Sequence, residues 1–184
     1  KNPKVFAVNL HEKGEGPSIS FWKDGFYEFK RGVEKTGIQK SSWASGGSAA
    51  FRKSIWKELG GFDSLFAPFY WEDIDISYRA LRRGYEIFWE PDSKVEHKHE
   101  TTIKRFNRRY VSWVQQRNQL LFIWKNISDQ ELLKAHRRFL SKRLISIRMG
   151  YWAPYLWAKL KYPQVKKDTS KFERSDQEII KYAG

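Results

Sequence analysis

Three carboxylates stand together in the stretch Trp71-Glu72-Asp73-Ile74-Asp75, directly after an aromatic segment that ends in Tyr70. Acids crowded at one site interact, which can raise the pKa of one of them and prepare it as a general base. The plainer interpretation is helix capping, because a helix N-terminus stabilises negative charge. Capping does not need three acids, however, and the neighbouring aromatic rings offer a stacking face to a sugar or a base. The pattern therefore favours a site that binds an acceptor and removes its proton.

Asp73 and Asp75 also have the spacing of the metal-binding Asp-x-Asp of nucleotide-sugar enzymes. That motif usually ends an apolar strand, whereas these acids open a helix, so we do not assign it here. His97 and His99 alternate on an extended segment, so their rings point the same way and could share a cation. A surface pair of histidines is the plainer alternative. With carboxylates from elsewhere in the protein, a histidine here could complete a divalent-metal site.

The hydrophobic pattern predicts the strands that must hold these residues. Residues 5–10 form an apolar run typical of a buried strand, and residues 18–30 alternate around Asp24-Gly25, which favours a hairpin turn. The first third of the chain is therefore expected to be rich in β-structure. Residues 85–89 predict another strand that Pro91 stops, before a further short strand runs into Val95.

Loops and helices are predicted between these strands. Residues 40–48 are small and polar around Gly46-Gly47, which predicts a loop that can approach a ligand closely. Apolar spacing predicts a short helix over 51–59. Acids in the first turn, arginines in the last turn and Gly84 beyond the end predict a helix over 72–83.

Residues 102–162 have a helical pattern throughout, and the residues after Pro163 are polar and charged. Between Arg137 and Trp157, basic and aromatic side chains have the composition of a helix that lies on an anionic membrane. A packed helix with a solvated basic face is the alternative. No stretch of about 18 uncharged apolar residues exists, so no membrane span is expected.

Composition narrows the class of protein. The 184 residues suffice for one domain with a core. The chain has no cysteine, which excludes disulfide scaffolds, thiolate catalysis and cysteine-ligated metal centres. The formal charge of +14 favours an anionic partner such as nucleic acid, phospholipid or a phosphorylated substrate. The chain opens on Lys1-Asn2-Pro3-Lys4 without an initiator Met or a signal segment, so we expect a piece of a longer protein.

Several motifs of the chain, taken in order, resemble a known family. The blocks are residues 44–53 (ASGGSAAFRK), 59–63 (LGGFD), 71–79 (WEDIDISYR), 83–85 (RGY) and 91–97 (PDSKVEH). In this order and spacing they resemble the second half of family 2 glycosyltransferases of the rhamnosyltransferase-like kind. The resemblance is good over residues 42–99 and weaker over residues 110–126.

The resemblance implies an α/β fold, the C-terminal part of a GT-A glycosyltransferase with a mixed sheet and helices, followed by a helical basic-aromatic C-terminal region. Residues 1–101 would form the second, acceptor-side half of the catalytic domain. Residues 102–162 would form the helical region, which could associate with a membrane, and residues 163–184 would be a polar tail. The first half of such a domain, which binds the nucleotide, is expected outside this chain.

The resemblance also implies roles for the residues that match the family's motifs. Asp73 is implied as the base that deprotonates the acceptor hydroxyl in an inverting transfer, and Glu72 as the residue that positions the acceptor. His97 is implied as a ligand of Mg²⁺ or Mn²⁺ beside an Asp-x-Asp outside this chain, with His99 as the substitute. Further residues are expected to line the site: Tyr70, Trp71 and Asp75 at the acceptor, and Gly46, Gly47 and Arg117 at the donor.

The resulting hypothesis is a glycosyltransferase that moves a sugar from a nucleotide-sugar donor to a glycan or lipid-linked acceptor in cell-envelope or extracellular polysaccharide synthesis. We expect it in the cytoplasm at the inner face of an anionic membrane, and we expect this chain alone to be inactive. A non-catalytic membrane-docking or scaffold domain is one alternative. A nucleic-acid-binding module is another, but no nucleic-acid-binding motif occurs and three acids lie in the most aromatic segment.

Overall fold

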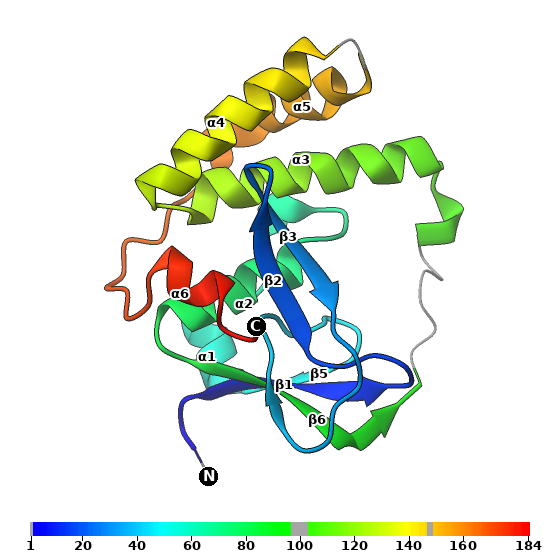
Figure 1. Ribbon diagram of the computed structural model, residues 1–184, viewed down its shortest axis with the longest axis vertical. Coiled ribbons are helices and arrows are strands. Elements are labelled where there is room, and N and C mark those ends of the chain that lie inside the picture. Colours follow the sequence, from blue (N-terminus) through cyan, green and yellow to red (C-terminus); the bar gives the residue numbers. More distant parts are fainter. Residues whose placement is uncertain (1, 97–102, 147–148) are drawn as a thin grey trace.

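A four-stranded mixed sheet lies in the lower half of the computed structural model, which describes residues 2–96, 103–146 and 149–184 (Figure 1). Its strand order is β4-β6-β1-β5. The central strands, β1 (Val5–Glu12) and β6 (Glu86–Val95), run parallel. The short strands β5 (Ala49–Phe51) and β4 (Gln39–Lys40) pair antiparallel with β1 and β6 respectively. The apolar runs of the sequence therefore predicted both central strands.

Contrary to the sequence prediction, Pro91 does not stop the strand. The pairing of β6 with β1 shifts register between Glu90, opposite Leu10, and Lys94, opposite His11. The residues between Glu90 and Lys94 form a bulge, so the ladder requires no hydrogen bond from the N–H that proline lacks. The two strands predicted over 85–95 are one strand, and it brings Val95 beside the end of β1.

A separate hairpin, β2 (Ser18–Lys23) and β3 (Phe26–Arg31), stands between the sheet and the upper helices (Figure 1). Asp24 and Gly25 form its turn with φ of 49° and 76°, so the predicted turn is confirmed. Aspartate and glycine suit this left-handed backbone better than most other residues. The tip is closely packed, because a Cβ added to Gly25 would lie 2.8 Å from the Cβ of Phe139.

Two helices follow the sheet strands. The helix α2 (Glu72–Arg82) matches its prediction, and Gly84, at φ 84°, lies just beyond its end. The helix α1 (Lys53–Glu58) is shorter than the predicted 51–59, because Phe51 pairs with Ala7 as part of β5. The loop predicted over residues 40–48, around Gly46-Gly47, runs from the end of β4 to the start of β5.

The helices α3 (Arg108–Asn126), α4 (Gln130–Ile145) and α5 (Trp152–Lys161) form the upper part of the molecule. Figure 1 shows α4 and α5 running side by side above α3. The helical pattern predicted for 102–162 is confirmed in its described part, with short 3₁₀ turns between the helices. No helix in the described ranges is both long and apolar enough to cross a membrane.

One hydrophobic core joins the upper and lower parts. The ring of Phe122 in α3 lies 4.8 Å from Tyr27 in the hairpin, 5.1 Å from Trp71 and 5.3 Å from Tyr78 in α2, measured between ring centroids. Phe122 is fully buried. Because α3 packs directly on α2 and on the hairpin, its position decides the surroundings of the acids at the start of α2.

The segment 163–184 also packs onto the domain, although its composition suggested a polar tail. It carries the short helix α6 (Asp176–Ile180), in which Ile179 is fully buried. The carboxylate of Asp176 lies 3.1 Å from the guanidinium of Arg82 and accepts a hydrogen bond from the hydroxyl of Tyr78, both in α2. The end of the chain therefore contributes to the core.

Candidate active site

The acids Glu72 and Asp73 lie in the first turn of α2, after two residues with unusual backbone angles. Tyr70 and Trp71 have φ of 67° and 79°, in the left-handed region that residues other than glycine seldom adopt. Such strain costs on the order of 1–3 kcal/mol for each residue and concentrates at functional sites. The turn presents Glu72 and Asp73 partly exposed while the residues that follow them are buried.

Helix α3 holds the strained segment in place. The side-chain amide of Asn118 donates hydrogen bonds to the carbonyl oxygens of Phe66, Phe69 and Tyr70 over 2.7, 3.0 and 2.8 Å. The guanidinium of Arg117 donates to the carbonyl oxygen of Ala67 over 2.6 Å. Side chains of α3 thus satisfy carbonyl groups that no regular element pairs.

The loop of residues 40–48, called the glycine loop after Gly46 and Gly47, lies against Asp73. The backbone N–H groups of Gly46 and Ile74 donate to its carboxylate over 3.2 and 2.9 Å. A Cβ added to Gly46 would lie 3.8 Å from the Cβ of Asp73, so the two backbones are neighbours. Gly47 lies in the same turn. The loop and Asp73 therefore lie in one region, and the roles of Gly46 and Gly47 at the donor stay predictions.

The glycine loop is anchored at two further points. The side chain of Asn9 in β1 accepts from the N–H of Ser45 over 2.8 Å and donates to the carbonyl oxygen of Trp43 over 2.7 Å. The hydroxyl of Ser77 accepts from the N–H of Ala44 over 3.0 Å. These bonds connect β1, the glycine loop and α2, and they fix the loop relative to the acids.

Burial raises the pKa values of both acids. Burial, with a smaller contribution from the charge of Asp73, raises the pKa of Glu72 to about 7. Burial also raises the pKa of Asp73, although the N–H groups of Gly46 and Ile74 and the charge of Arg31 act in the opposite direction. Near neutral pH the pair can therefore hold a proton that two solvated carboxylates would release.

Arg31, at the end of β3, was not singled out from the sequence. Its guanidinium lies 4.4 Å from the ring centroid of Trp43 and 3.0 Å from the carboxylate of Glu15, and it donates to the hydroxyl of Ser18 over 3.0 Å. It is a basic residue near Asp73, and no local pattern distinguishes it from the other 34 Lys and Arg residues.

Asp75 and Trp71, which were expected to contact the acceptor, are buried inside the protein. Asp75 is fully buried, with its carboxylate 2.8 Å from Nε of Arg79 and 2.8 Å from Nζ of Lys125. The amide of Asn126 donates to the same carboxylate over 2.8 Å. Trp71 is only 4% exposed and packs in the core, so neither side chain offers a surface to an acceptor. Helix α3, which the acid-rich motif does not include, provides the partners that bury both.

Arg117, expected at the donor, is also buried. It is 1% exposed, and its guanidinium lies 4.1 Å from the ring centroid of Trp157 in α5. Burial lowers its pKa to about 10. Its guanidinium donates to the carbonyl oxygen of Ala67, before α2, and to the side-chain oxygen of Asn118, so in this structure it supports the site and does not face a ligand.

Tyr70 remains partly exposed, and its aromatic segment contacts a second aromatic segment that the sequence did not indicate. Its ring lies 5.4 Å from that of Phe69, and Phe69 lies 5.3 Å from Phe106 and 6.3 Å from Tyr110. Phe106 is 41% exposed. These rings come from two segments about 40 residues apart in the chain, so only their packing joins them into one surface.

The predicted metal ligands His97 and His99 lie outside the described residues. Among residues 2–96, 103–146 and 149–184, no group of three or more His, Asp or Glu side chains could hold a metal ion. This part of the chain therefore offers no complete divalent-metal site, and His97 stays a prediction.

Known proteins resemble the chain in sequence. The family model described as Glycosyl transferase family group 2 matches residues 18–166. The O-antigen chain rhamnosyltransferase RfbN of Salmonella typhimurium is 31% identical over 83 residues, which are 44% of this chain and 25% of that protein. The O-antigen chain rhamnosyltransferase WbaN of Salmonella anatum is 27% identical over 95 residues, which are 50% of this chain and 29% of that protein. The chain thus spans about a quarter of the length of these curated relatives.

The fold resembles a solved glycosyltransferase. The crystal structure of GalNAc-T7 with UDP, GalNAc and Mn²⁺ matches with a TM-score of 0.56 at 15% sequence identity, over 98% of this chain and 35% of that chain. This likeness confirms the expected GT-A fold. The family model extends from β2 to beyond α5, which is most of the chain, and the O-antigen rhamnosyltransferases agree with it. The chain belongs to the glycosyltransferase family group 2.

Proposed function

We propose that this chain is the acceptor-side half of an enzyme that transfers a sugar from a nucleotide-sugar donor to a hydroxyl group of a glycan or lipid-linked acceptor. The observation that carries the proposal is the placement of Asp73, at the start of α2, against the backbone of Gly46. The O-antigen rhamnosyltransferases among the relatives support a role in cell-envelope polysaccharide synthesis.

In this proposal Asp73 is the general base of a single displacement with inversion. The acceptor oxygen forms a bond to the anomeric carbon of the donor while the bond from that carbon to the nucleotide diphosphate breaks. The proton of the acceptor hydroxyl passes to the carboxylate of Asp73. A pKa above the ordinary value makes Asp73 a stronger base, and the N–H groups of Gly46 and Ile74 hold its carboxylate in one orientation.

Glu72 is suited to a different task. Because its pKa is about 7, it keeps a proton near neutral pH part of the time, and a protonated carboxyl donates a hydrogen bond. We assign it to positioning the acceptor through another hydroxyl group. Tyr70 and its aromatic neighbours Phe69 and Phe106 provide ring faces on which an acceptor sugar can stack.

Gly46 leaves room beside Asp73. A side chain at Gly46 would occupy space beside the Cβ of Asp73 and the ring of Phe62, whereas glycine leaves that space open. We propose that the donor sugar lies against this backbone, as the resemblance implied. The nucleotide would be held by the part of the enzyme outside this chain, so this chain alone is expected to be inactive.

We also propose that the enzyme works at the cytoplasmic face of an anionic membrane. Helix α5 exposes Trp152, Leu156 and Leu160, which follow one another at helical spacing and are 42%, 53% and 78% exposed. The indole N–H of Trp152 donates to the carbonyl oxygen of Leu144 over 3.1 Å, which places the 80% exposed Ile145 next to this stripe. Basic side chains on α4 and α5 could attract anionic headgroups.

Substitution of Asp73 in the full-length enzyme tests the assignment of the base. Asp73→Asn should lower kcat by about 10² to 10⁴ while nucleotide-sugar binding, measured by calorimetry, stays within about twofold. An asparagine oxygen can still accept from the N–H of Gly46, so the local fold is retained. The matched control is Asp92→Asn, the same change at an exposed position on β6, which should leave kcat unchanged. Wild-type turnover of Asp73→Asn would refute the assignment.

A further inference from the structure

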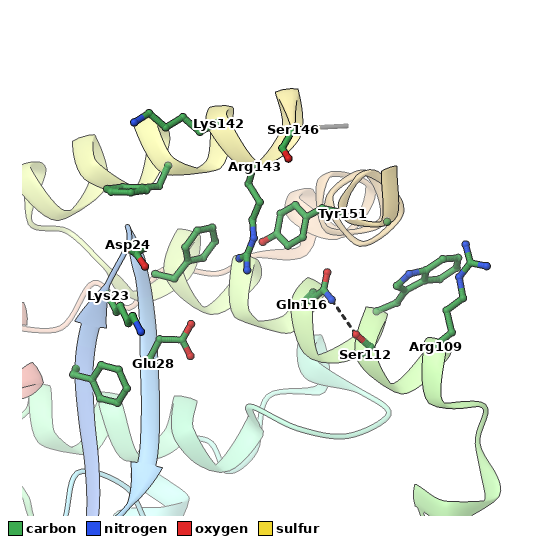
Figure 2. Close-up of a pocket in the computed structure, with 15 residues that line it drawn as sticks. Lys23, Asp24, Glu28, Arg109, Ser112, Gln116, Lys142, Arg143, Ser146 and Tyr151 are labelled. Carbon is green, nitrogen blue, oxygen red and sulfur yellow. Dashed lines mark hydrogen bonds between the residues drawn. The ribbon is translucent and has the colours of Figure 1, made fainter. Parts of the chain in front are cut away.

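A cavity of about 1050 Å³ lies between the hairpin, α3, α4 and the turn before α5, away from the acids of α2 (Figure 2). Four hairpin side chains share the face toward it because they are cross-strand partners: Phe21 with Glu28, and Lys23 with Phe26. The alternate residues Tyr27 and Phe29 face the opposite way and contact Trp71. The hairpin therefore separates this cavity from the candidate active site.

Arg143 in α4 is the basic residue held most firmly at this cavity. Figure 2 shows its side chain descending from α4 toward α3 beside Tyr151. The guanidinium carbon lies 4.7 Å from the ring centroid of Phe26 and 4.6 Å from that of Tyr151, so two aromatic faces orient it. Within the described ranges no carboxylate forms an ion pair with it, so the N–H groups that do not face Tyr151 remain available to an anion.

Tyr151 lines the same cavity and has an unsatisfied hydroxyl. The residue is 7% exposed, and its buried hydroxyl donates to no acceptor in the described part of the chain, although the guanidinium of Arg143 is close enough to donate to it. Arg143 carries donors only and cannot accept the hydroxyl proton. Burial raises the pKa of Tyr151 to about 12, so the hydroxyl remains a donor at neutral pH. Because this hydroxyl belongs to a residue that lines the cavity, a ligand bound there is in a position to accept its proton.

The charges and rings around the cavity indicate the class of ligand. Four basic residues line it, Lys23, Arg109, Lys142 and Arg143, against the two acids Asp24 and Glu28. The excess of two positive charges matches a phosphate monoester, which carries about −1.5 to −2 at neutral pH. Arg109 lies over the ring of Trp113, and the aromatic lining provides faces for a sugar ring.

We propose that this cavity binds a phosphorylated sugar through Arg143 and the hydroxyl of Tyr151, as a site separate from the one where transfer occurs. We infer the phosphate group from the excess of positive charge around the cavity and from the Tyr151 hydroxyl, which has no acceptor for its proton. The choice of a sugar as its carrier rests on the proposed function. A lipid phosphate would offer the same anion, so the experiment must separate these two sources.

Calorimetric titration of the chain with glucose 1-phosphate, glucose and inorganic phosphate tests the proposal directly. Glucose 1-phosphate should bind at least about tenfold more tightly than either of the others, because only it supplies both the anion and the ring. Tyr151→Phe removes only the hydroxyl, and Arg143→Gln removes the charge. Each should weaken binding of glucose 1-phosphate about tenfold or more, as expected for loss of a hydrogen bond to a charged group.

Matched controls separate the site from a general effect of charge or stability. Arg138→Gln makes the same change at an exposed position of α4 that does not line the cavity, and it should leave binding unchanged. Tyr182→Phe makes the same change at a tyrosine that does not line the cavity and should also be neutral. If either control weakens binding as much as its test variant, the assignment of the cavity is refuted.

The remaining outcomes are equally decisive. Equal binding of glucose and glucose 1-phosphate would refute the anion site, and equal binding of inorganic phosphate would refute the sugar. Vesicles of phosphatidylcholine with and without phosphatidic acid form the lipid arm. If Tyr151→Phe abolishes binding to phosphatidic acid while glucose 1-phosphate never binds, the phosphate belongs to a lipid and the proposal is wrong. None of these measurements uses turnover, so their failure leaves the assignment of Asp73 untouched.

Discussion

Glu72 and Asp73 are neighbours in the sequence, yet their carboxylates meet different surroundings. Asp73 accepts hydrogen bonds from two backbone N–H groups, which stabilise its ionised form. Glu72 has one carboxylate oxygen that is buried without a partner in the described residues. At the scale of the residue, this difference favours Asp73 as the charged base and Glu72 as the group that holds a proton.

The raised pKa of Glu72 predicts how stability depends on pH. Burial raises this pKa from 4.5 to about 7, so between these values the folded protein holds a proton that the unfolded chain has released. The free energy of unfolding therefore falls as the pH rises from about 4.5 to about 7, and the fall ends above pH 7. Glu72→Gln has no proton to lose and should flatten this part of the profile in urea denaturation.

Asp73 contributes in the same direction, because burial also raises its pKa, so the slope should decrease in Glu72→Gln without vanishing. Asp92→Asn, at an exposed position on β6, serves as the control and should leave the profile parallel to that of the wild type. A Glu72→Gln profile as steep as that of the wild type would contradict the raised pKa.

Among the secondary-structure elements, helices α2 and α3 are joined by a buried group of ion pairs. Asp75 in α2 lies between Arg79 of the same helix and Lys125 of α3, and Lys125 also lies 2.7 Å from Asp63. Every charge in this group has an opposite partner, as buried charges require. The group aligns α3 so that Asn118 can hold the strained residues before the acids.

Loss of the Asp75 charge should destabilise the fold strongly. Asp75→Asn leaves Lys125 and Arg79 buried with less negative charge, and breaking a buried ion pair in this way costs about 3–5 kcal/mol. Urea denaturation should show this loss in the free energy of unfolding. The control is Glu58→Gln, since Glu58 pairs with Arg83 at 3.5 Å on the surface and should cost less than about 1 kcal/mol. Equal effects of the two substitutions would contradict the structural role of Asp75.

Helix α5 carries the prediction for the membrane. Leu156→Ser and Leu160→Ser remove exposed apolar side chains, so the fold should persist while co-sedimentation with anionic vesicles decreases. Binding should also weaken at high salt, because each basic residue near the membrane surface contributes about 1 kcal/mol that salt screens.

Val33→Ser is the matched control for α5, because Val33 is 76% exposed at a distant site and should not affect vesicle binding. If Leu160→Ser binds vesicles as well as the wild type does, α5 is not the docking surface. If the chain binds single-stranded DNA more tightly than vesicles, the nucleic-acid alternative returns.

At the scale of the whole molecule, distant parts of the chain meet at Asp176. Its carboxylate accepts from the hydroxyl of Tyr78 in α2 and from the N–H groups of Ser128 and Asp129, both over 2.7 Å, at the start of α4. Arg82 completes the group. The last helix thereby joins the acid-bearing helix to the upper helices.

Removal of residues 175–184 should therefore lower the stability of the whole domain. Arg82 would lose its buried carboxylate partner, which costs about 3–5 kcal/mol, and the apolar surface beneath Ile179 would be exposed. Denaturation in urea measures the loss in the free energy of unfolding. Removal of residues 183–184 alone is the control and should have little effect. A loss below about 1 kcal/mol for the longer truncation would show that this segment is a dispensable tail.

Local features of the sequence determined the elements and the family. Asp24-Gly25 predicted the hairpin turn because few residue pairs adopt its left-handed backbone angles. Gly84 marked the end of α2 because glycine adopts a positive φ more easily than other residues do. The order of short motifs around Gly46 and Glu72-Asp73 indicated the glycosyltransferase family, which the family model and the relatives confirm. These signals depend on residues close together in the chain, so the sequence alone contains them.

Only the tertiary structure decided which of the candidate residues are accessible to a ligand. Asp75 and Trp71 belong to the same motif as Asp73, but α3, about 50 residues later, buries both of them. Arg117 is one basic residue among 35, and its contact with Trp157 makes it a support of the site. Burial and charge pairing arise from contacts between segments far apart in the chain, and the residue types of one segment do not specify them.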